Sequence, residues 1–139
     1  MPSIFTRIID GEFPGHFVWK DEQAVAFMTI QPVREGHLMV IPRAEIDHWD
    51  DLPEPVAAHL MIVSQRIARA LKDVFPCRRI GMMIAGLEVP HTHLHVVPID
   101  DLGDLSFAKA RAADAVRLAA EATRIRAALR ARGHQEADF

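Results

Sequence analysis

Three histidines alternate with small or apolar residues in the segment EVPHTHLHVVP, residues 88–98. This alternation constrains the fold, because successive side chains of a β-strand point to opposite faces of a sheet. A strand over residues 91–97 would place His91, His93 and His95 on one face. The other face would receive Thr92, Leu94 and Val96, and this more apolar set would face a core.

A row of three histidines is open to three interpretations. One is a structural cluster of hydrogen-bonded rings, although such histidines usually occur singly. A metal site is limited by geometry, because the outer Cα atoms would lie about 13 Å apart while a zinc–nitrogen bond is about 2.1 Å long. The third is nucleophilic catalysis, in which a neutral His93 attacks phosphorus and its two neighbours fix its tautomer and bind phosphate oxygens.

The rest of the chain has the patterns of a small mixed domain. A hairpin is predicted at 17–28 about a polar turn at 21–23, and further strands at 36–42, at 78–86 and at the histidine segment, which Pro98 ends. Apolar residues at steps of three and four predict a helix over 55–74, ended by Pro76, and a long helix over about 107–132. This order predicts an α+β domain whose helices pack on one face of a mostly antiparallel sheet.

Composition narrows the class of protein. The 139 residues are 50% hydrophobic and 25% charged, which fits one globular domain. A net charge of -3 argues against nucleic-acid binding. The N-terminal residues carry charges and prolines, and no segment approaches about 18 apolar residues, so we expect a cytoplasmic protein without a membrane partner. Cys77 is the only cysteine, which excludes an internal disulfide, and we expect it to be a buried small residue.

The segment HTHLHVV resembles the signature of the histidine triad (HIT) family of nucleotide hydrolases and transferases, with Thr92 in a usually apolar position. Upstream, IFTRIIDGEFPGHFVWKDEQAVAFMTIQP and EGHLMVIPR are similar to the N-terminal half of the family. The resemblance covers about residues 4–98. It implies a single HIT domain over 1–139, with that core and a helical extension at 99–139. The implied fold is a five-stranded, mostly antiparallel sheet with one central helix and a long C-terminal helix.

The resemblance also implies an activity. In the family the middle histidine attacks the α-phosphorus of a nucleotide, and water then resolves the nucleotidyl-histidine; this role would fall to His93. The implied supporting histidines are His91, His95 and His37, and the implied apolar base pocket consists of Phe5, Ile8, Phe27 and Ile30. No cofactor is implied. The expected partners are a small nucleotide substrate and a second copy of the chain.

The expected homodimer would have the helix over 55–74 at or near its two-fold axis. An independent physical reason is that residues 60–63 are four apolar residues in a row. One stripe of a helix that faces a core does not use four consecutive residues, so a second face needs cover.

Three departures from the family pattern bear on substrate and metal. Thr29 stands where many relatives carry an aspartate that binds the ribose hydroxyls, and residues 86–88 replace a Gly-Gln-Ser/Thr segment. Glu88 is either a proton donor or a charge at the rim. The family's N-terminal cysteine pair is missing, and so is the histidine expected where Ala44 and Glu45 stand. His48 is nearby without an assigned role, and we expect no structural zinc.

Two functions remain open at this stage. The first is a histidine-triad enzyme that cleaves a nucleoside phosphoramidate, a dinucleoside polyphosphate or a related phosphoanhydride. The second is a nucleotide-binding or interaction protein that keeps the fold with little turnover, a reading that the changes at Thr29 and at residues 86–88 motivate.

Overall fold

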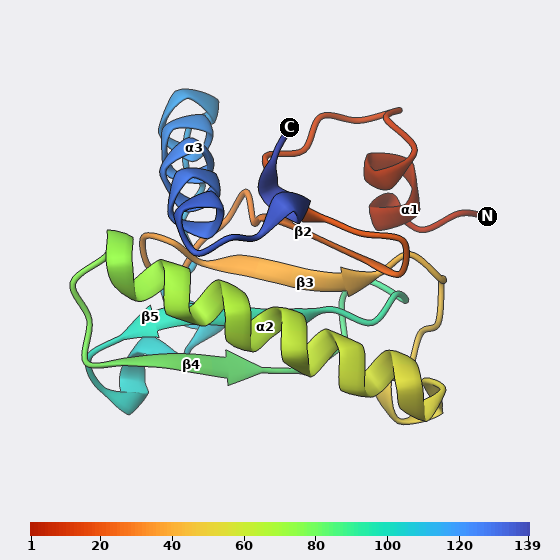
Figure 1. Ribbon diagram of the computed structural model, residues 1–139. Coiled ribbons are helices and arrows are strands. Elements are labelled where there is room, and N and C mark those ends of the chain that lie inside the picture. The colour runs from red at the N-terminus through yellow and green to blue at the C-terminus, as the bar shows by residue number, and fades with distance from the viewer.

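The protein, described here over residues 1–139 by a computed structural model, is built on one five-stranded sheet (Figure 1). In chain order the elements are α1 (Ile4–Ile9), β1 (Phe17–Lys20), β2 (Ala24–Met28), β3 (Leu38–Pro42), α2 (Glu54–Val74), β4 (Arg79–Met83), β5 (Leu94–Ile99) and α3 (Ala115–Ala131). The strand order is β1-β2-β3-β5-β4, and every neighbouring pair is antiparallel. The predicted α+β class, with five strands, a central helix and a long C-terminal helix, is confirmed.

One face of the sheet carries the main apolar core. Side chains alternate along β2 and β3, so Ala26 and Val40 face α2 while Phe27 and Met39 face the other way. The predicted stripe of α2 packs on the first face, and Leu60, Val63, Ile67, Ala70 and Leu71 are all buried there. The helix predicted over 55–74 is confirmed, and the observed α2 begins one residue earlier, at Glu54.

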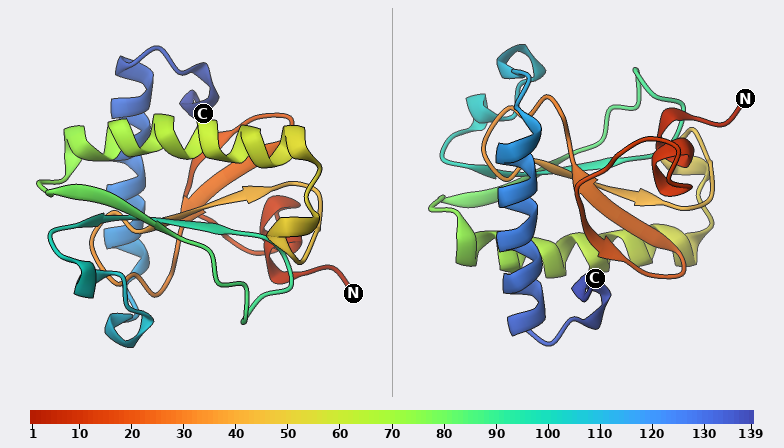
Figure 2. Two further views of the ribbon diagram at one scale, coloured as in Figure 1. Left: turned by 90° about the horizontal axis from the view of Figure 1, so that it is seen from below. Right: turned by 90° about the horizontal axis from the view of Figure 1, so that it is seen from above.

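The opposite face is covered by α1, which the sequence patterns did not predict. The two views in Figure 2 show α1 and α2 on opposite sides of the sheet. They also show that α3 runs across from one side of the sheet to the other. The prediction that all helices pack on one face is therefore wrong. A six-residue helix is too short to show an apolar period, and α1 begins because the Ser3 hydroxyl accepts the Thr6 N–H at 3.1 Å.

The histidine strand starts and ends later than predicted. β5 begins at Leu94 rather than at residue 91, and Pro98 lies inside it, paired with Ile80 of β4. The partner β3 pairs with β5 only as far as Val96. Beyond that residue β5 has a neighbour on one side only, so the missing N–H of Pro98 is tolerated there.

The C-terminal helix is shorter than the prediction of 107–132. Residues 107–109 form a separate 3-10 turn, and α3 starts at Ala115 because the Asp114 carboxylate accepts the Arg117 N–H at 2.8 Å. Its predicted stripe is confirmed, since Leu118, Ala122, Ile125 and Leu129 are buried in the main core. Cys77 is only half-buried, contrary to expectation. None of the helices combines the length and apolar character that crossing a membrane requires.

Candidate functional site

A cavity of about 560 Å³ lies on the sheet face opposite α2. Its walls come from α1, the end of β2, residues 88–89, and the segment from residue 107 to the start of α3. Every predicted site residue except His91 lines it; these are Phe5, Ile8, Phe27, Thr29, Ile30, His37, Glu88, His93 and His95.

Strand register explains why these residues meet. Phe27 is the direct partner of Met39, and Met39 is the direct partner of His95, so the three side chains share the cavity face. Leu94 and Val96 point into the core beneath α2, as the alternation predicts. His93 precedes the strand by one residue and keeps the same side as His95.

His37 and His95 form a hydrogen-bonded pair whose proton positions can be assigned. The Val33 N–H donates to His37 Nδ1 at 3.1 Å, so the proton of the neutral His37 ring is on Nε2. That nitrogen lies 2.9 Å from His95 Nδ1 and donates to it. The remaining proton of His95 is therefore on Nε2, which has no protein partner. His95 thus offers an N–H donor to the cavity.

His93 has the opposite polarity. Its Nδ1 lies 2.7 Å from the His91 carbonyl oxygen, which can only accept, so Nδ1 carries the proton. In the neutral form of the ring, Nε2 then has a free lone pair, and it has no protein partner. Arg7 Nε is the only buried side-chain nitrogen or oxygen without a hydrogen-bond partner, so the Nε2 atoms of His93 and His95, two residues that line the cavity, are accessible from it. The Phe5 ring packs edge-on against His93, with ring centroids 4.9 Å apart.

His91 leaves the row predicted for the three histidines. Its side chain is fully buried outside the cavity, where Nε2 donates to the Pro42 carbonyl at 2.7 Å and Nδ1 lies 2.7 Å from the Ser3 hydroxyl. β5 begins only at Leu94, so residue 91 lies before the strand and the two-residue alternation does not apply to it. Thr92 likewise donates its hydroxyl to the Ile46 carbonyl at 2.7 Å instead of joining the core.

The buried rings of His37, His91 and His95 are neutral at pH 7. Burial lowers the pKa of His37 to about 4, and burial, helped by the neighbouring His37 and His93 rings, lowers the pKa of His95 to about 3. Burial also lowers the pKa of His91, against the opposing effect of its bond to Pro42. A neutral ring carries one proton, so the hydrogen-bond directions assigned above to His37, His91 and His95 are the only consistent set.

The loop before His37 is held by α3. Gly36 has φ +81, and a β-carbon there would lie 2.9 Å from the Phe75 ring, so both conformation and space require glycine. The Gly36 N–H donates to the buried Glu121 carboxylate of α3 at 2.9 Å, and Arg117 pairs with Glu121 at 2.8 Å. The C-terminal helix therefore helps to set the place of His37.

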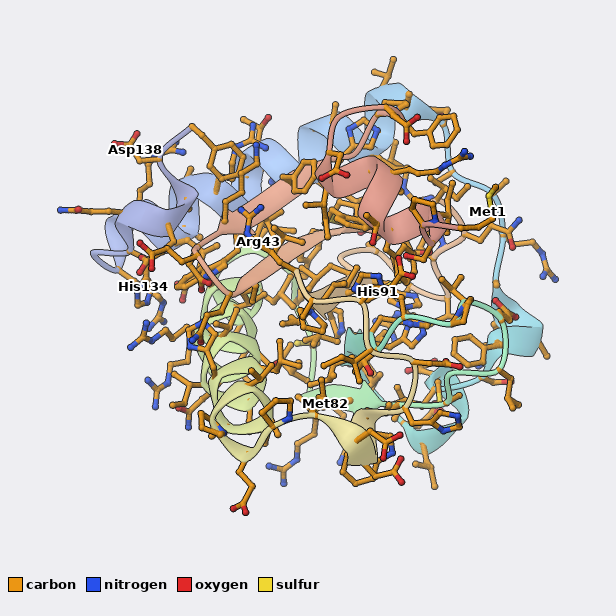
Figure 3. All side chains as sticks on the ribbon, turned by 90° about the vertical axis from the view of Figure 1, so that its right-hand side faces the viewer. Met1, Arg43, Met82, His91, His134 and Asp138 are labelled. Carbon is orange, nitrogen blue, oxygen red and sulfur yellow. The ribbon has the colours of Figure 1, made fainter.

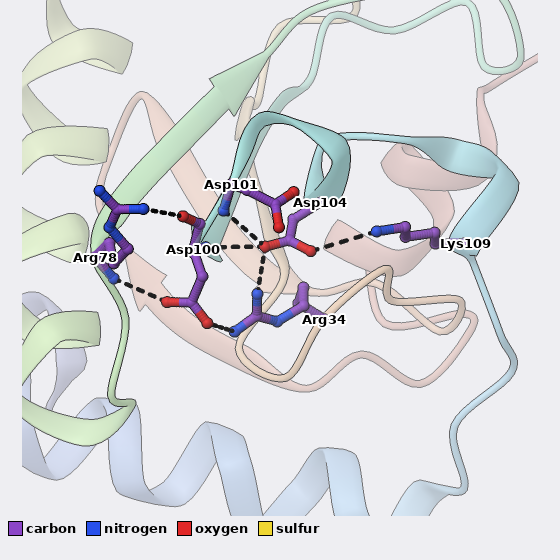
Figure 4. Close-up of polar contacts among 6 residues, drawn as sticks. All are labelled: Arg34, Arg78, Asp100, Asp101, Asp104 and Lys109. Atoms are coloured by element: carbon purple, nitrogen blue, oxygen red, sulfur yellow. Dashed lines mark hydrogen bonds and ion pairs between the residues drawn. The ribbon is translucent and has the colours of Figure 1, made fainter.

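A charged cluster holds the wall on the other side of the cavity (Figure 4). Arg34 pairs with Asp104 at 2.6 Å and with Asp100 at 3.2 Å. The N–H groups of Asp100 and Asp101, and then Arg34 and Lys109, lower the pKa of Asp104 to about 2, so it is charged at pH 7. The cluster ties the loop before His37 to the segment that carries Phe107, whose ring lies 4.9 Å from that of His95.

Two of the positions that depart from the family pattern, Thr29 and Glu88, lie at the rim of the cavity. Thr29 follows β2 and is half-buried, and its hydroxyl accepts the Gln31 N–H at 3.3 Å. Ile30 is 70% exposed, so it borders the cavity rather than filling it. Glu88 is exposed beside the opening. His48 is solvent-exposed and does not line the cavity.

Several lining residues were not predicted. His16 and Met39 line the cavity. So do five residues of the segment after β5: Phe107, Ala110, Ala113, Ala115 and Leu118. Met39 could have been found from the strand alternation once Phe27 was placed. The segment after β5 has no pattern that distinguishes a cavity wall from an alanine-rich surface, so no sequence signal was available for it.

Residues 10–102 match the model of the HIT domain family. The chain belongs to the HIT family. The adenosine 5'-monophosphoramidase of Saccharomyces cerevisiae is 33% identical to it over 70% of this chain and 63% of that protein. A zinc-bound histidine triad family protein from Mycobacterium smegmatis is 30% identical, covers 94% of each chain and superposes with a TM-score of 0.80. A hypothetical histidine triad nucleotide-binding protein from Sulfolobus tokodaii, 24% identical, shares the fold over 97% of each chain with a TM-score of 0.82.

The mycobacterial protein is described as zinc-bound. In the present chain, no three His, Cys, Asp or Glu side chains are grouped so that they could hold a metal ion. The single cysteine, Cys77, precedes β4, away from the cavity lining.

Proposed function

We propose that this HIT protein is a nucleotidyl hydrolase in which His93 is the nucleophile. The observation that carries the proposal is the polarity of the His93 ring. Its Nδ1 is committed to the His91 carbonyl at 2.7 Å, so the unprotonated Nε2 is the nitrogen that is open to the cavity. A neutral imidazole nitrogen of this kind is a competent nucleophile at pH 7.

The reaction proceeds in two displacements. His93 Nε2 forms a bond to the α-phosphorus while the bond to the leaving group breaks, and the leaving group departs with a proton from solvent. The His95 Nε2–H donates to a phosphate oxygen as negative charge grows there. Water then attacks the same phosphorus, the Nε2–P bond breaks, and a nucleoside monophosphate and a proton are released.

The base would occupy the apolar end of the cavity. Phe5, Phe27 and Met39 are buried there, and Ile8 packs against them. Edge-to-face contacts between Phe5, Phe27 and Phe17 fix the ring planes, with centroids 5.3 to 5.7 Å apart. Such a wall binds a flat ring through apolar contact area and leaves the choice of base to the few polar groups at the rim.

The leaving group would carry little negative charge. No lysine or arginine lines the cavity, and its one carboxylate is Glu88. A dinucleoside polyphosphate places several further negative charges beyond the α-phosphate, and these would lack counter-charges here. A phosphoramidate with an amine leaving group adds none. We therefore propose the phosphoramidate class rather than the polyphosphate class, in agreement with the name of the yeast relative.

The test compares two substrates on one enzyme. We expect turnover of adenosine 5'-phosphoramidate to exceed that of a diadenosine polyphosphate, with a radiolabelled adenylyl group trapped on the wild type by acid-free quenching and absent from His93→Ala. Lack of turnover with both substrates, with bound AMP still detected by calorimetry, would instead support the binding protein with little activity.

We also propose that the protein is a homodimer through α2 and the edge strand β4. Met61 and Ile62 of α2 are 58% and 46% exposed, and Met82 of β4 is 36% exposed. β4 has a strand neighbour on one side only. Light scattering at micromolar concentration should give twice the chain mass, and a monomer mass would reject the dimer.

A further inference from the structure

The N-terminal turn of the chain contacts the histidine that does not line the cavity. The Ser3 hydroxyl lies 2.7 Å from His91 Nδ1 although the two residues are 88 positions apart. Both side chains are buried, and Figure 3 shows His91 among the interior side chains. The hydroxyl must donate, because the proton of the neutral His91 ring is committed to the Pro42 carbonyl at 2.7 Å.

Glu45 and Thr6 hold Ser3 in this donating position. One oxygen of the Glu45 carboxylate, Oε1, accepts the Ser3 N–H at 2.6 Å and the Thr6 hydroxyl at 2.7 Å. The Thr6 N–H in turn donates to the Ser3 hydroxyl oxygen at 3.1 Å. The Ser3 hydroxyl also lies 3.4 Å from the Thr6 hydroxyl oxygen, but its 2.7 Å contact with His91 Nδ1 is much shorter, so its single proton is assigned to His91.

The hydrogen bonds that begin at Ser3 extend through His91 to the ring of His93. His91 is held at both ring nitrogens, and its own carbonyl oxygen accepts the proton of His93 Nδ1. Phe5, the second residue of the helix that Ser3 caps, packs edge-on against both His91 and His93, with centroids 5.9 and 4.9 Å away. A shift of Ser3 would therefore move the acceptor and the packing surface of His93 together.

We propose that Ser3, supported by Thr6 and Glu45, is a positioning residue that acts through His91 to hold His93 in its reactive orientation. The role rests on the proposed function, since it concerns the nucleophile of that reaction. Ser3, Thr6 and Glu45 do not line the cavity, whereas Ile4 and Phe5, which lie between Ser3 and Thr6 in the chain, do. Substrate affinity is therefore expected to depend on the cluster less than the rate does, and only through Ile4 and Phe5.

The primary test is Ser3→Ala compared with two matched variants. We expect kcat for a phosphoramidate to fall about ten-fold with a smaller change in KM, because small displacements of a reacting group reduce rate more than binding. Ser3→Thr keeps the hydroxyl and the helix cap and should restore kcat. Ser64→Ala removes another buried serine hydroxyl, which bonds the Leu60 carbonyl at 2.7 Å in α2, and should change stability without changing kcat.

A second measurement needs no turnover. Long-range ¹H–¹⁵N correlation spectra should show His91 as a single Nε2–H tautomer in the wild type and in Ser3→Thr, and as a mixture or a shifted ring in Ser3→Ala. The Thr6 hydroxyl lies 3.5 Å from His91 Nδ1 and could take over, so the double variant Ser3→Ala/Thr6→Val removes both donors. Unchanged His91 spectra and unchanged kcat in the double variant would overturn the proposal. An inactive wild type with the expected spectra would reject the hydrolase function and leave the hydrogen-bond role of Ser3 established.

Discussion

The two faces of the sheet differ in what they contribute: one carries most of the apolar core, and the other carries the cavity with the histidines. The face beneath α2 belongs to a cluster of 20 buried apolar residues that also takes in α3. The opposite face has a cluster of only five, and beside it stand His37, His93 and His95 around a cavity. The same strand, β5, serves both, with Val96 on one side and His95 on the other. Substitutions on the two faces should therefore separate unfolding free energy from turnover.

The largest effect is expected on the cavity face. His93→Ala and His93→Asn should lower kcat at least about a thousand-fold, because both remove the attacking nitrogen. The melting temperature should change little, since the ring borders an open cavity rather than the main core. Steady-state kinetics and thermal unfolding of the same samples test the separation. His95→Asn is the comparison variant, and its rate should fall less; near-wild-type turnover by His93→Ala would remove this histidine from the nucleophile's role.

On the core face the effects should be reversed. Ile67 is fully buried in α2, and Ile67→Ala should lower the free energy of unfolding by roughly 2 to 5 kcal/mol through lost contacts and a cavity. The kcat of the folded fraction should remain that of the wild type. Gln65→Ala, at an exposed position of the same helix, is the control and should stay within about 0.5 kcal/mol. A large loss of kcat in folded Ile67→Ala would show that the faces are coupled.

Lowering the pH should reduce the free energy of unfolding first through the buried histidines of the cavity face. The pKa values of His37 and His95, about 4 and about 3, lie below the ordinary 6.5, so the unfolded chain binds more protons between these limits and stability falls as pH falls through this range. From pH 7 to pH 5 each ring should contribute a loss of about 2 kcal/mol, in a window where most carboxylates stay charged. Urea unfolding of the wild type and of His37→Asn/His95→Asn measures it. Equal pH slopes in the two proteins would contradict the assignment.

The smallest effect concerns the rim. Thr29→Asp should tighten AMP binding by about 1 kcal/mol or more, because a carboxylate makes charge-assisted hydrogen bonds to a ribose diol that a hydroxyl cannot match. The wild type should discriminate weakly between AMP and 2'-deoxy-AMP. Calorimetric titration of both proteins with both nucleotides is the measurement. Strong ribose preference in the wild type would mean that another group, such as Glu88, reaches the sugar.

Much of the fold could be predicted because local patterns carry it. The hairpin about residues 21–23 and the α2 stripe were found within a few residues of their observed bounds. Two of the errors fall where a long-range neighbour overrides a local signal. Pro98 continues a strand because β3 has already ended, and α1 lies opposite α2 because Phe5 packs on residues of β2 and β3.

The sequence by itself determined the alternation that separates His93 and His95 from Leu94 and Val96, since this follows from the covalent geometry of an extended chain. It could not determine where His91 goes, because that ring is placed by Ser3, 88 residues away, and by the Pro42 carbonyl. Nor could it determine the direction of each histidine proton. That direction follows from which ring nitrogen faces a backbone carbonyl or N–H, and those groups come together only when the chain has folded.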